Sequence, residues 1–212
     1  MLIEKQFEKA KLIMSLRSMG IVSDDVLSAI EETPRELFIP KNFSHYAYEN
    51  SPLPIGFDQT ISQPYIVALM TQKLELDKND IILEIGTGSG YQTSIISKLV
   101  RKVFTIERIN PLLIEAKNCF RKLKQTNIET KLGDGYLGWK EMSPFNKVII
   151  TCSTANIDHD IFKQIVVGGK CIAPVGKLSG KQVLKCITIS KARDTDIWED
   201  ICSVNFVPLI RD

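Results

Sequence analysis

The spacing of hydrophobic and polar residues changes near residue 80. Before that point, apolar residues such as Phe7, Ala10 and Ile13 recur every three to four positions, as they do along one face of a helix. This spacing predicts helices over most of residues 1–50, with an apolar stripe that packs on the rest of the molecule. Ser23 precedes Val26 and the apolar residues after it, and it is placed to be the N-cap of a second helix.

Residues 51–64 interrupt the helical pattern. This stretch, SPLPIGFDQTISQP, has three prolines, one glycine and several small polar residues, which favours a loop over a regular element. Loops of this length in compact domains are often functional. Pro64 suits the first position of a further helix that runs to Leu74.

From residue 80 onward, short apolar runs alternate with amphipathic segments of helical length. Strands are predicted at 81–86, 102–107, 127–133 and 147–151, with helices at 91–100, 111–123 and 161–167. The apolar runs do not alternate cleanly, as expected for parallel strands that are covered on both faces. A strand at 170–176 and two last runs at 182–190 and 200–210 predict an antiparallel C-terminal edge.

The predicted fold class is therefore α/β, with a Rossmann-like, doubly wound mixed sheet, mostly parallel, and an N-terminal helical extension. We expect a single domain over residues 1–212, in which 1–78 form the extension with the long loop and 79–212 form the α/β core.

Composition narrows the functions that the chain can have. The 27 basic and 25 acidic residues leave a net charge of +2, too weak to argue for a nucleic-acid or membrane partner. No apolar run approaches the roughly 20 residues of a membrane span, and the first residues lack the core of a signal peptide, so a cytoplasmic location is expected. Five widely spaced cysteines and two histidines make a metal site improbable.

A glycine-rich turn follows the first predicted core strand. Gly86, Gly88 and Gly90 give the pattern G-x-G-x-G, which differs from the dinucleotide fingerprint G-x-G-x-x-G. Such a turn lets a ligand approach the backbone closely, although it is equally compatible with a purely structural turn.

Two acidic residues at the ends of the next strands favour the ligand interpretation. Glu107 lies where a carboxylate can accept from both hydroxyls of a ribose, and Asp134 lies where one can accept from an adenine amino group. The alternatives are that Glu107 pairs with Arg108 or Lys102 on the surface and that Asp134 caps a turn. Taken together, the three features favour a nucleoside site, and acidic residues including Glu84 suit the positive sulfonium of S-adenosylmethionine.

At this point the sequence resembles the protein-L-isoaspartate O-methyltransferases, a family of class I methyltransferases. The resemblance rests on LEIGTGSGYQT, FTIER and GDGYLGW, and on the more specific QTISQP and FVPL; it covers the chain from about residue 20. It implies a monomeric repair enzyme that uses S-adenosylmethionine to methylate the α-carboxylate of L-isoaspartyl residues in damaged proteins and peptides.

The same resemblance implies roles for individual residues. Ser62 would be the catalytic residue, and Thr60, Val207 and Pro208 would help it to bind the substrate. The cofactor would be bound by Glu84, Gly86, Thr87, Gly88, Gly90, Glu107, Asp134 and Gly135. An isoaspartyl carboxylate, with a pKa of about 4, is already ionised at neutral pH, so this reaction needs no general base.

The chain departs from the family pattern in the loop after the fourth core strand. Residues 151–156 read TCSTAN where the family usually has an alanine-rich stretch with proline, which leaves the substrate open. Cys152 is expected to be a small buried thiol. The alternatives are a class I methyltransferase with another acceptor, a non-catalytic binding protein and, less favoured by the glycine spacing, a nicotinamide-dependent oxidoreductase.

Overall fold

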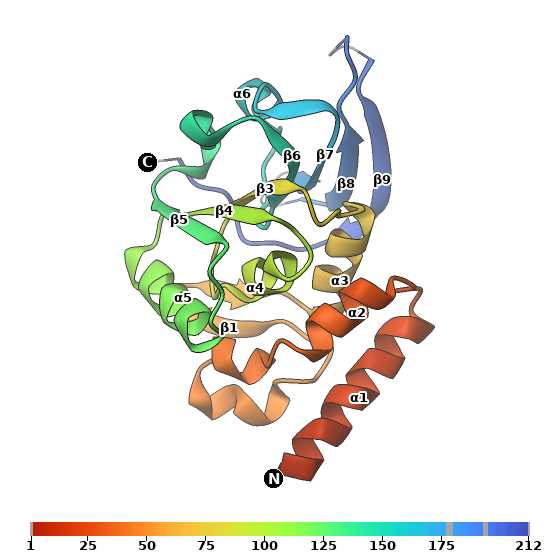
Figure 1. Ribbon diagram of the computed structural model, residues 1–212, viewed down its shortest axis with the longest axis vertical. Coiled ribbons are helices and arrows are strands. Elements are labelled where there is room, and N and C mark those ends of the chain that lie inside the picture. The colour runs from red at the N-terminus through yellow and green to blue at the C-terminus, as the bar shows by residue number, and fades with distance from the viewer. Residues whose placement is uncertain (1, 177–179, 193–194, 212) are drawn as a thin grey trace.

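A seven-stranded sheet forms the centre of the molecule (Figure 1). The computed structural model describes residues 2–176, 180–192 and 195–211. The strands lie in the order β5-β4-β3-β6-β7-β8-β9, parallel from β5 to β7 and antiparallel from β7 to β9. Their bounds are β3 Ile81–Ile85, β4 Lys102–Glu107, β5 Ile128–Leu132, β6 Phe145–Ile150, β7 Ile165–Gly176, β8 Gln182–Thr188 and β9 Ile197–Val204. The predicted mixed, Rossmann-like sheet is confirmed.

Each face of the sheet has its own hydrophobic core. Ile82 and Val103 pack on one face with the helices α3 (Pro64–Lys73), α4 (Tyr91–Ser97) and α5 (Asn110–Lys122). Leu83 and Phe104 pack on the other face with α6 (His159–Phe162) and Trp139. Successive strand residues point to opposite faces, so a strand buried on both sides is apolar at nearly every position, as the sequence indicated.

The N-terminal extension contains α1 (Leu2–Ser18), α2 (Asp24–Glu31) and the 3-10 helices η1 (Arg35–Phe38) and η2 (Lys41–Tyr46). Ser23 is the N-cap of α2, as predicted, and its hydroxyl accepts from the Val26 N–H at 3.4 Å. The predicted packing face of α1 is wrong: Phe7 is 66% exposed, and Leu12 and Leu16 are buried instead. Because α1 packs mainly against α2 and α3, a narrow stripe is covered, and Figure 1 shows the helix along the outside of the molecule.

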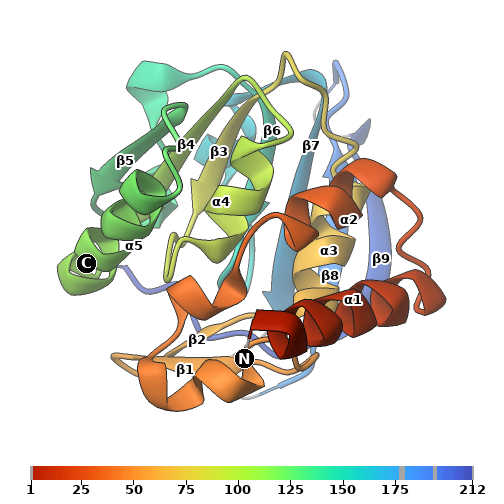
Figure 2. The same ribbon diagram turned by 60° about the horizontal axis from the view of Figure 1, so that its bottom comes forward.

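Residues 51–64 contain a β-hairpin rather than the predicted loop. Its strands are β1 (Leu53–Gly56) and β2 (Gln59–Ile61), and Figure 2 shows them below the end of the main sheet. Phe57 and Asp58 form the turn with φ angles of 53° and 56°, the left-handed conformation that two-residue hairpin turns need. The sequence concealed this element because its prolines suggested a loop and because Phe-Asp is an unusual pair in such a turn.

Three predicted boundaries near the C-terminus were also wrong. The helix predicted at 161–167 ends at Phe162, and β7 already begins at Ile165. The last strand ends at Val204, and the segment after it is not a strand but forms an isolated bridge between Pro208 and Ser153, which follows β6. Among the described helices, none is both long enough and apolar enough to cross a bilayer.

Candidate active site

A cavity lies at the carboxyl ends of the parallel strands, beside β3. The chain reverses its direction of winding here, since β3 has β4 on one side and β6 on the other. Ligands of open α/β sheets bind at this kind of switch point. The walls come from residues 59–62, 85–89, 106–109, 133, 135, 151–152 and 207–210, with Val67, Tyr91 and Gln92.

The glycine turn brings its backbone to the cavity wall. Gly86, Gly88 and Gly90 all have positive φ, at 97°, 52° and 85°. A Cβ on Gly86 would lie 2.4 Å from the Thr151 Oγ1, so this position has no room for a side chain. Gly90 does not line the cavity; a Cβ there would lie 2.7 Å from the Phe120 ring, and its role is to let α4 pack on α5.

Glu107 ends β4 and is almost fully buried at the cavity wall. Its Oε2 accepts from the Gly88 N–H at 2.7 Å, and its Oε1 accepts from the Ile109 N–H at 2.9 Å. An ionised carboxylate has about four acceptor sites, so both oxygens keep capacity for the hydroxyls of a ligand. The alternative pairing with Lys102 is not formed, because that lysine pairs with Glu129 at 2.8 Å.

Glu84 lies behind the glycine turn and not in the cavity, contrary to the direct cofactor contact that we expected. It is fully buried and accepts hydrogen bonds from the hydroxyls of Thr93 and Thr105, the latter at 2.6 Å. The hydroxyl of Thr105 is in turn 2.6 Å from that of Thr87. The chain of hydroxyls therefore lets Glu84 support the turn from within the core.

Burial raises the pKa of Glu84 to about 7, with a further contribution from the charge of Glu107. In the unfolded chain this carboxyl group loses its proton near the ordinary pKa of 4.5. Between pH 4.5 and about 7, Glu84 is therefore protonated in the native state and ionised in the unfolded state. Stability from this group is then present at low pH and falls as the pH rises to about 7.

We expect Glu84→Gln to remove that pH dependence, since an amide does not ionise. The variant should gain about 3 kcal/mol relative to the parent protein between pH 4.5 and pH 8, the size of a shift of this kind. Urea unfolding of both proteins at the two pH values measures the difference, in which groups common to both cancel. An equal difference at both pH values would contradict the assignment.

Asp134 serves the turn that follows β5. Its Oδ1 accepts from the Tyr136 N–H at 2.8 Å, which makes it the N-cap of a short 3-10 helix, η3 (Gly135–Leu137). Its neighbours Gly133 and Gly135 line the cavity, whereas Asp134 is not among the lining residues. The turn-capping alternative is thus present, and an adenine contact would have to use the remaining acceptor sites of the carboxylate.

Ser62 lies between the cavity and a neighbouring groove. The groove extends along Pro52, Gln63, Ile66 and residues 203–207, and it shares Thr60, Ser62, Thr151 and Val207 with the cavity. The residue before α3 is Gln63, and it makes no side-chain cap, so Ser62 is not a helix cap. Within the described part of the chain, no hydrogen-bond partner is found for the Ser62 hydroxyl.

The C-terminal segment closes one side of the cavity. The Ser153 N–H donates to the Val207 carbonyl and the Leu209 N–H donates to the Ser153 carbonyl, each at 2.8 Å. Gln182 bonds to both the N–H and the carbonyl of Phe206, at 2.7 and 3.1 Å. These contacts hold Val207 and Pro208 at the wall, where both were expected.

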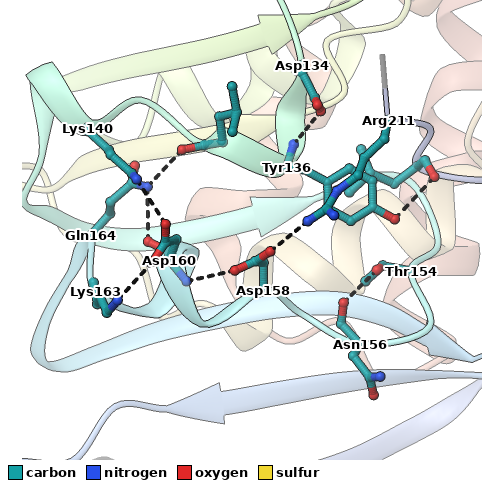
Figure 3. A network of polar contacts seen from close by, with 12 residues as sticks. Asp134, Tyr136, Lys140, Thr154, Asn156, Asp158, Asp160, Lys163, Gln164 and Arg211 are labelled. Atoms are coloured by element: carbon teal, nitrogen blue, oxygen red, sulfur yellow. Dashed lines mark hydrogen bonds and ion pairs between the residues drawn. The ribbon is translucent and has the colours of Figure 1, made fainter.

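Beyond this wall, Arg211 fastens the same segment to the rest of the molecule. Figure 3 shows it between Asp158, which it pairs with at 2.9 Å, and the ring of Tyr136, whose centre lies 4.6 Å away. Tyr136 belongs to the turn after β5 that Asp134 caps, and Asp158 lies in the loop after β6. The contacts of Arg211 therefore join the C-terminal segment to both loops.

Comparison with known proteins agrees with this geometry. The model of the protein-L-isoaspartate(D-aspartate) O-methyltransferase family matches residues 7–212. The chain belongs to this family. The resemblance seen in the sequence motifs is confirmed, and it extends to nearly the whole chain.

Curated members of the isoaspartate methyltransferase family are similar along almost their full length. The protein-L-isoaspartate O-methyltransferase of Dictyoglomus thermophilum is 44% identical over 206 residues, which cover 97% of this chain and 92% of the relative. That of Rhodospirillum centenum is 45% identical over 205 residues, covering 96% of this chain and 92% of the relative.

Solved structures show the same fold. A protein-L-isoaspartate O-methyltransferase superposes with a TM-score of 0.84 and 29% identity; the match covers 94% of this chain and 65% of that longer chain. A Plasmodium falciparum protein, described as a putative member and solved with S-adenosyl-L-homocysteine, has a TM-score of 0.83 and 24% identity over 95% of this chain and 98% of its own.

The sequence did not single out Thr151 as a site residue. Its hydroxyl donates to the Ile85 carbonyl at 3.0 Å and also to that of Gly86, and the residue lines both the cavity and the groove. Its position in the sequence, directly after a core strand that pairs with β3, could have indicated that it lies at the site. Cys152 beside it is the buried thiol that was expected, and burial raises its pKa well above the ordinary range.

Proposed function

We propose that this chain transfers a methyl group from S-adenosylmethionine to the free α-carboxylate of L-isoaspartyl residues in damaged proteins. The observation that carries the proposal is the junction at Ser62, where a cavity with nucleoside-type contacts opens into a groove able to take a peptide. Membership of the family supports the same reaction.

The residues of the cavity fit S-adenosylmethionine. Among the lining residues that the structure describes there is no lysine and one arginine, Arg108, and the backbone of the glycine turn lines the cavity at Gly86 and Gly88. Glu107 would hold the ribose hydroxyls, and Gly133 and Gly135 would flank the adenine. When bound, the cofactor supplies a methyl group made electrophilic by its positive sulfonium.

The chain's own residues then have to orient the acceptor and exclude water. The isoaspartyl carboxylate, with a pKa of about 4, is ionised at pH 7, so no residue has to remove a proton. The Ser62 hydroxyl donates a hydrogen bond that orients this carboxylate without neutralising it. Val207 and Pro208 form an apolar wall that keeps water from the attacking oxygen.

The first experiment uses two synthetic peptides that are identical except for L-isoaspartate or L-aspartate at one position. We expect labelled methyl from S-adenosylmethionine to appear, as a base-labile ester, on the isoaspartyl peptide alone. Label on neither peptide, with cofactor binding shown separately by calorimetry, would contradict the proposal and indicate another acceptor or a binding role.

Ser62→Ala should lower turnover with little loss of cofactor affinity, because the hydroxyl is assigned to the substrate. We expect a decrease of about ten- to a hundredfold in kcat/KM, the result of losing one hydrogen bond to a charged group. Ser97→Ala is a control, since that hydroxyl donates to the Ser94 carbonyl and accepts from the Gln125 amide, away from the cavity. Equal losses of turnover and cofactor affinity would show that Ser62 supports the cofactor or the fold instead.

We further propose that the enzyme acts as a cytoplasmic monomer on protein and peptide substrates, without a nucleic-acid partner. The net charge of +2 agrees with the last point. Light scattering at micromolar concentration checks the mass, and a dimer would contradict the proposal.

A further inference from the structure

The largest side chain among the fully buried residues belongs to the N-terminal extension and not to the sheet. Arg35, in η1, has no exposed surface. Burial lowers its pKa only to about 10, so the guanidinium keeps its charge at neutral pH. Among the described residues it forms no ion pair, and burying an uncompensated charge is costly. A position of this kind requires an explanation beyond packing.

The guanidinium bonds to four backbone carbonyls instead. Its Nη1 donates to Ala47 and Glu49, at 2.9 and 3.3 Å. Its Nη2 donates to Ser51 at 2.9 Å and to Ser62 at 3.1 Å. Only a planar group with several fixed N–H donors can satisfy so many acceptors from one site.

The last two carbonyls are the two ends of the β1–β2 hairpin. Ser51 lies just before β1 and Ser62 lies just after β2, so the single Nη2 atom closes the open end of the hairpin. The hairpin brings Thr60 and Ser62 to the cavity and the groove. The Arg35 guanidinium also lies 5.8 Å from the centre of the Tyr91 ring, which lines the cavity.

We propose that Arg35 is a positioning residue for methyl transfer, which fixes the backbone of Ser62 so that its hydroxyl meets the substrate carboxylate. The inference rests on the proposed function of Ser62. Arg35 itself is buried behind the hairpin and touches neither substrate nor cofactor. It acts through the Ser62 carbonyl, and a small shift of the reacting groups is enough to lower turnover strongly.

Arg35→Lys tests this role, because it keeps the charge and most of the length but loses the planar fork. Four quantities are measured: the affinity for S-adenosylhomocysteine, the affinity of the loaded enzyme for an isoaspartyl peptide, and kcat and KM with S-adenosylmethionine. We expect kcat/KM and peptide affinity to fall about tenfold or more, with S-adenosylhomocysteine affinity within about threefold of the parent.

Asn127→Ala is the matched control for a purely structural effect. The Asn127 side chain also holds several backbone carbonyls, those of Ser97, Val100 and Arg101, but at the end of the sheet opposite the cavity. This variant should lose stability and keep its kinetic constants when assayed well below its Tm. If Arg35→Lys behaves in the same way, or loses S-adenosylhomocysteine and peptide affinity equally, the proposal is overturned.

Asn50→Ala provides a second variant in case Arg35→Lys does not fold. The Asn50 Oδ1 accepts from the Tyr65 N–H at 2.9 Å, and this hydrogen bond holds the chain just after Ser62. We expect the same pattern with a smaller loss, about two- to fivefold in kcat/KM. Unchanged peptide affinity and turnover in this variant would also count against positioning through the hairpin base.

The parent protein separates this inference from the proposed function. If the parent methylates the isoaspartyl peptide and Arg35→Lys does so equally well, the positioning role fails and the function stands. If the parent transfers no methyl group to either peptide, the function fails. Peptide binding to the S-adenosylhomocysteine-loaded enzyme is then compared between parent and Arg35→Lys, and equal affinities overturn the positioning role as well.

Discussion

Glu107→Ala is expected to weaken S-adenosylmethionine binding by about 1 to 3 kcal/mol, the range for losing hydrogen bonds to a charged acceptor. The upper part of this range is favoured, because the carboxylate also accepts from the Gly88 and Ile109 N–H groups and so holds the glycine turn in place. Isothermal calorimetry with S-adenosylmethionine measures the change.

Glu129→Ala is the control for Glu107. Glu129 lies on the adjacent strand β5 and forms a partly exposed ion pair with Lys102, so its loss should leave cofactor affinity unchanged. Unchanged affinity in Glu107→Ala would refute the ribose assignment. A loss in both variants would indicate a general effect of negative charge near this edge of the sheet.

Gly86→Ala is expected to abolish measurable cofactor binding. Two costs combine at this position: the φ of 97° is strained for any L side chain, and the new Cβ would lie 2.4 Å from the Thr151 Oγ1. Since Thr151 follows β6 and lines both the cavity and the groove, relief of this clash would displace a wall of the site. Calorimetry and thermal unfolding together measure the two effects.

Gly20→Ala separates these costs. Gly20 has nearly the same φ, 94°, but a Cβ added there would have no atom within 4 Å. This control should lose roughly 1 to 2 kcal/mol of stability from the backbone alone and keep its cofactor affinity. Combining Gly86→Ala with Thr151→Ala removes the clashing hydroxyl and should restore part of the binding. No recovery would mean that backbone strain dominates.

The sequence predicted the structure correctly where the fold itself imposes a local pattern of residues. The strands of the sheet were predictable because burial on both faces leaves apolar runs at Ile81–Ile85 and Lys102–Glu107. The position of Glu107 was predictable for a related reason, since the carboxyl ends of neighbouring parallel strands meet at one edge.

The same approach failed where a contact between distant segments decides the structure. The hairpin at Leu53–Ile61 is held by strand pairing and by Arg35, and its prolines indicated a loop instead. Glu84 looked like a cofactor ligand because it precedes the glycine turn, yet alternation along β3 directs its side chain to Thr93 and Thr105. The period of a pattern assigns residues to a face of their own element, but it does not show which distant side chains that face meets.

The walls of the cavity come from residues as far apart as Gln59 and Ile210, and no single element contains them. A ligand that binds only this assembled form stabilises the whole chain, by about 2.7 kcal/mol at a hundredfold excess over its Kd. Opening any one wall, including the C-terminal segment that Arg211 holds in place, removes this stabilisation by the ligand. A larger supply of cofactor therefore raises the free energy of unfolding, and a repair enzyme of this design is most stable while its methyl donor is available.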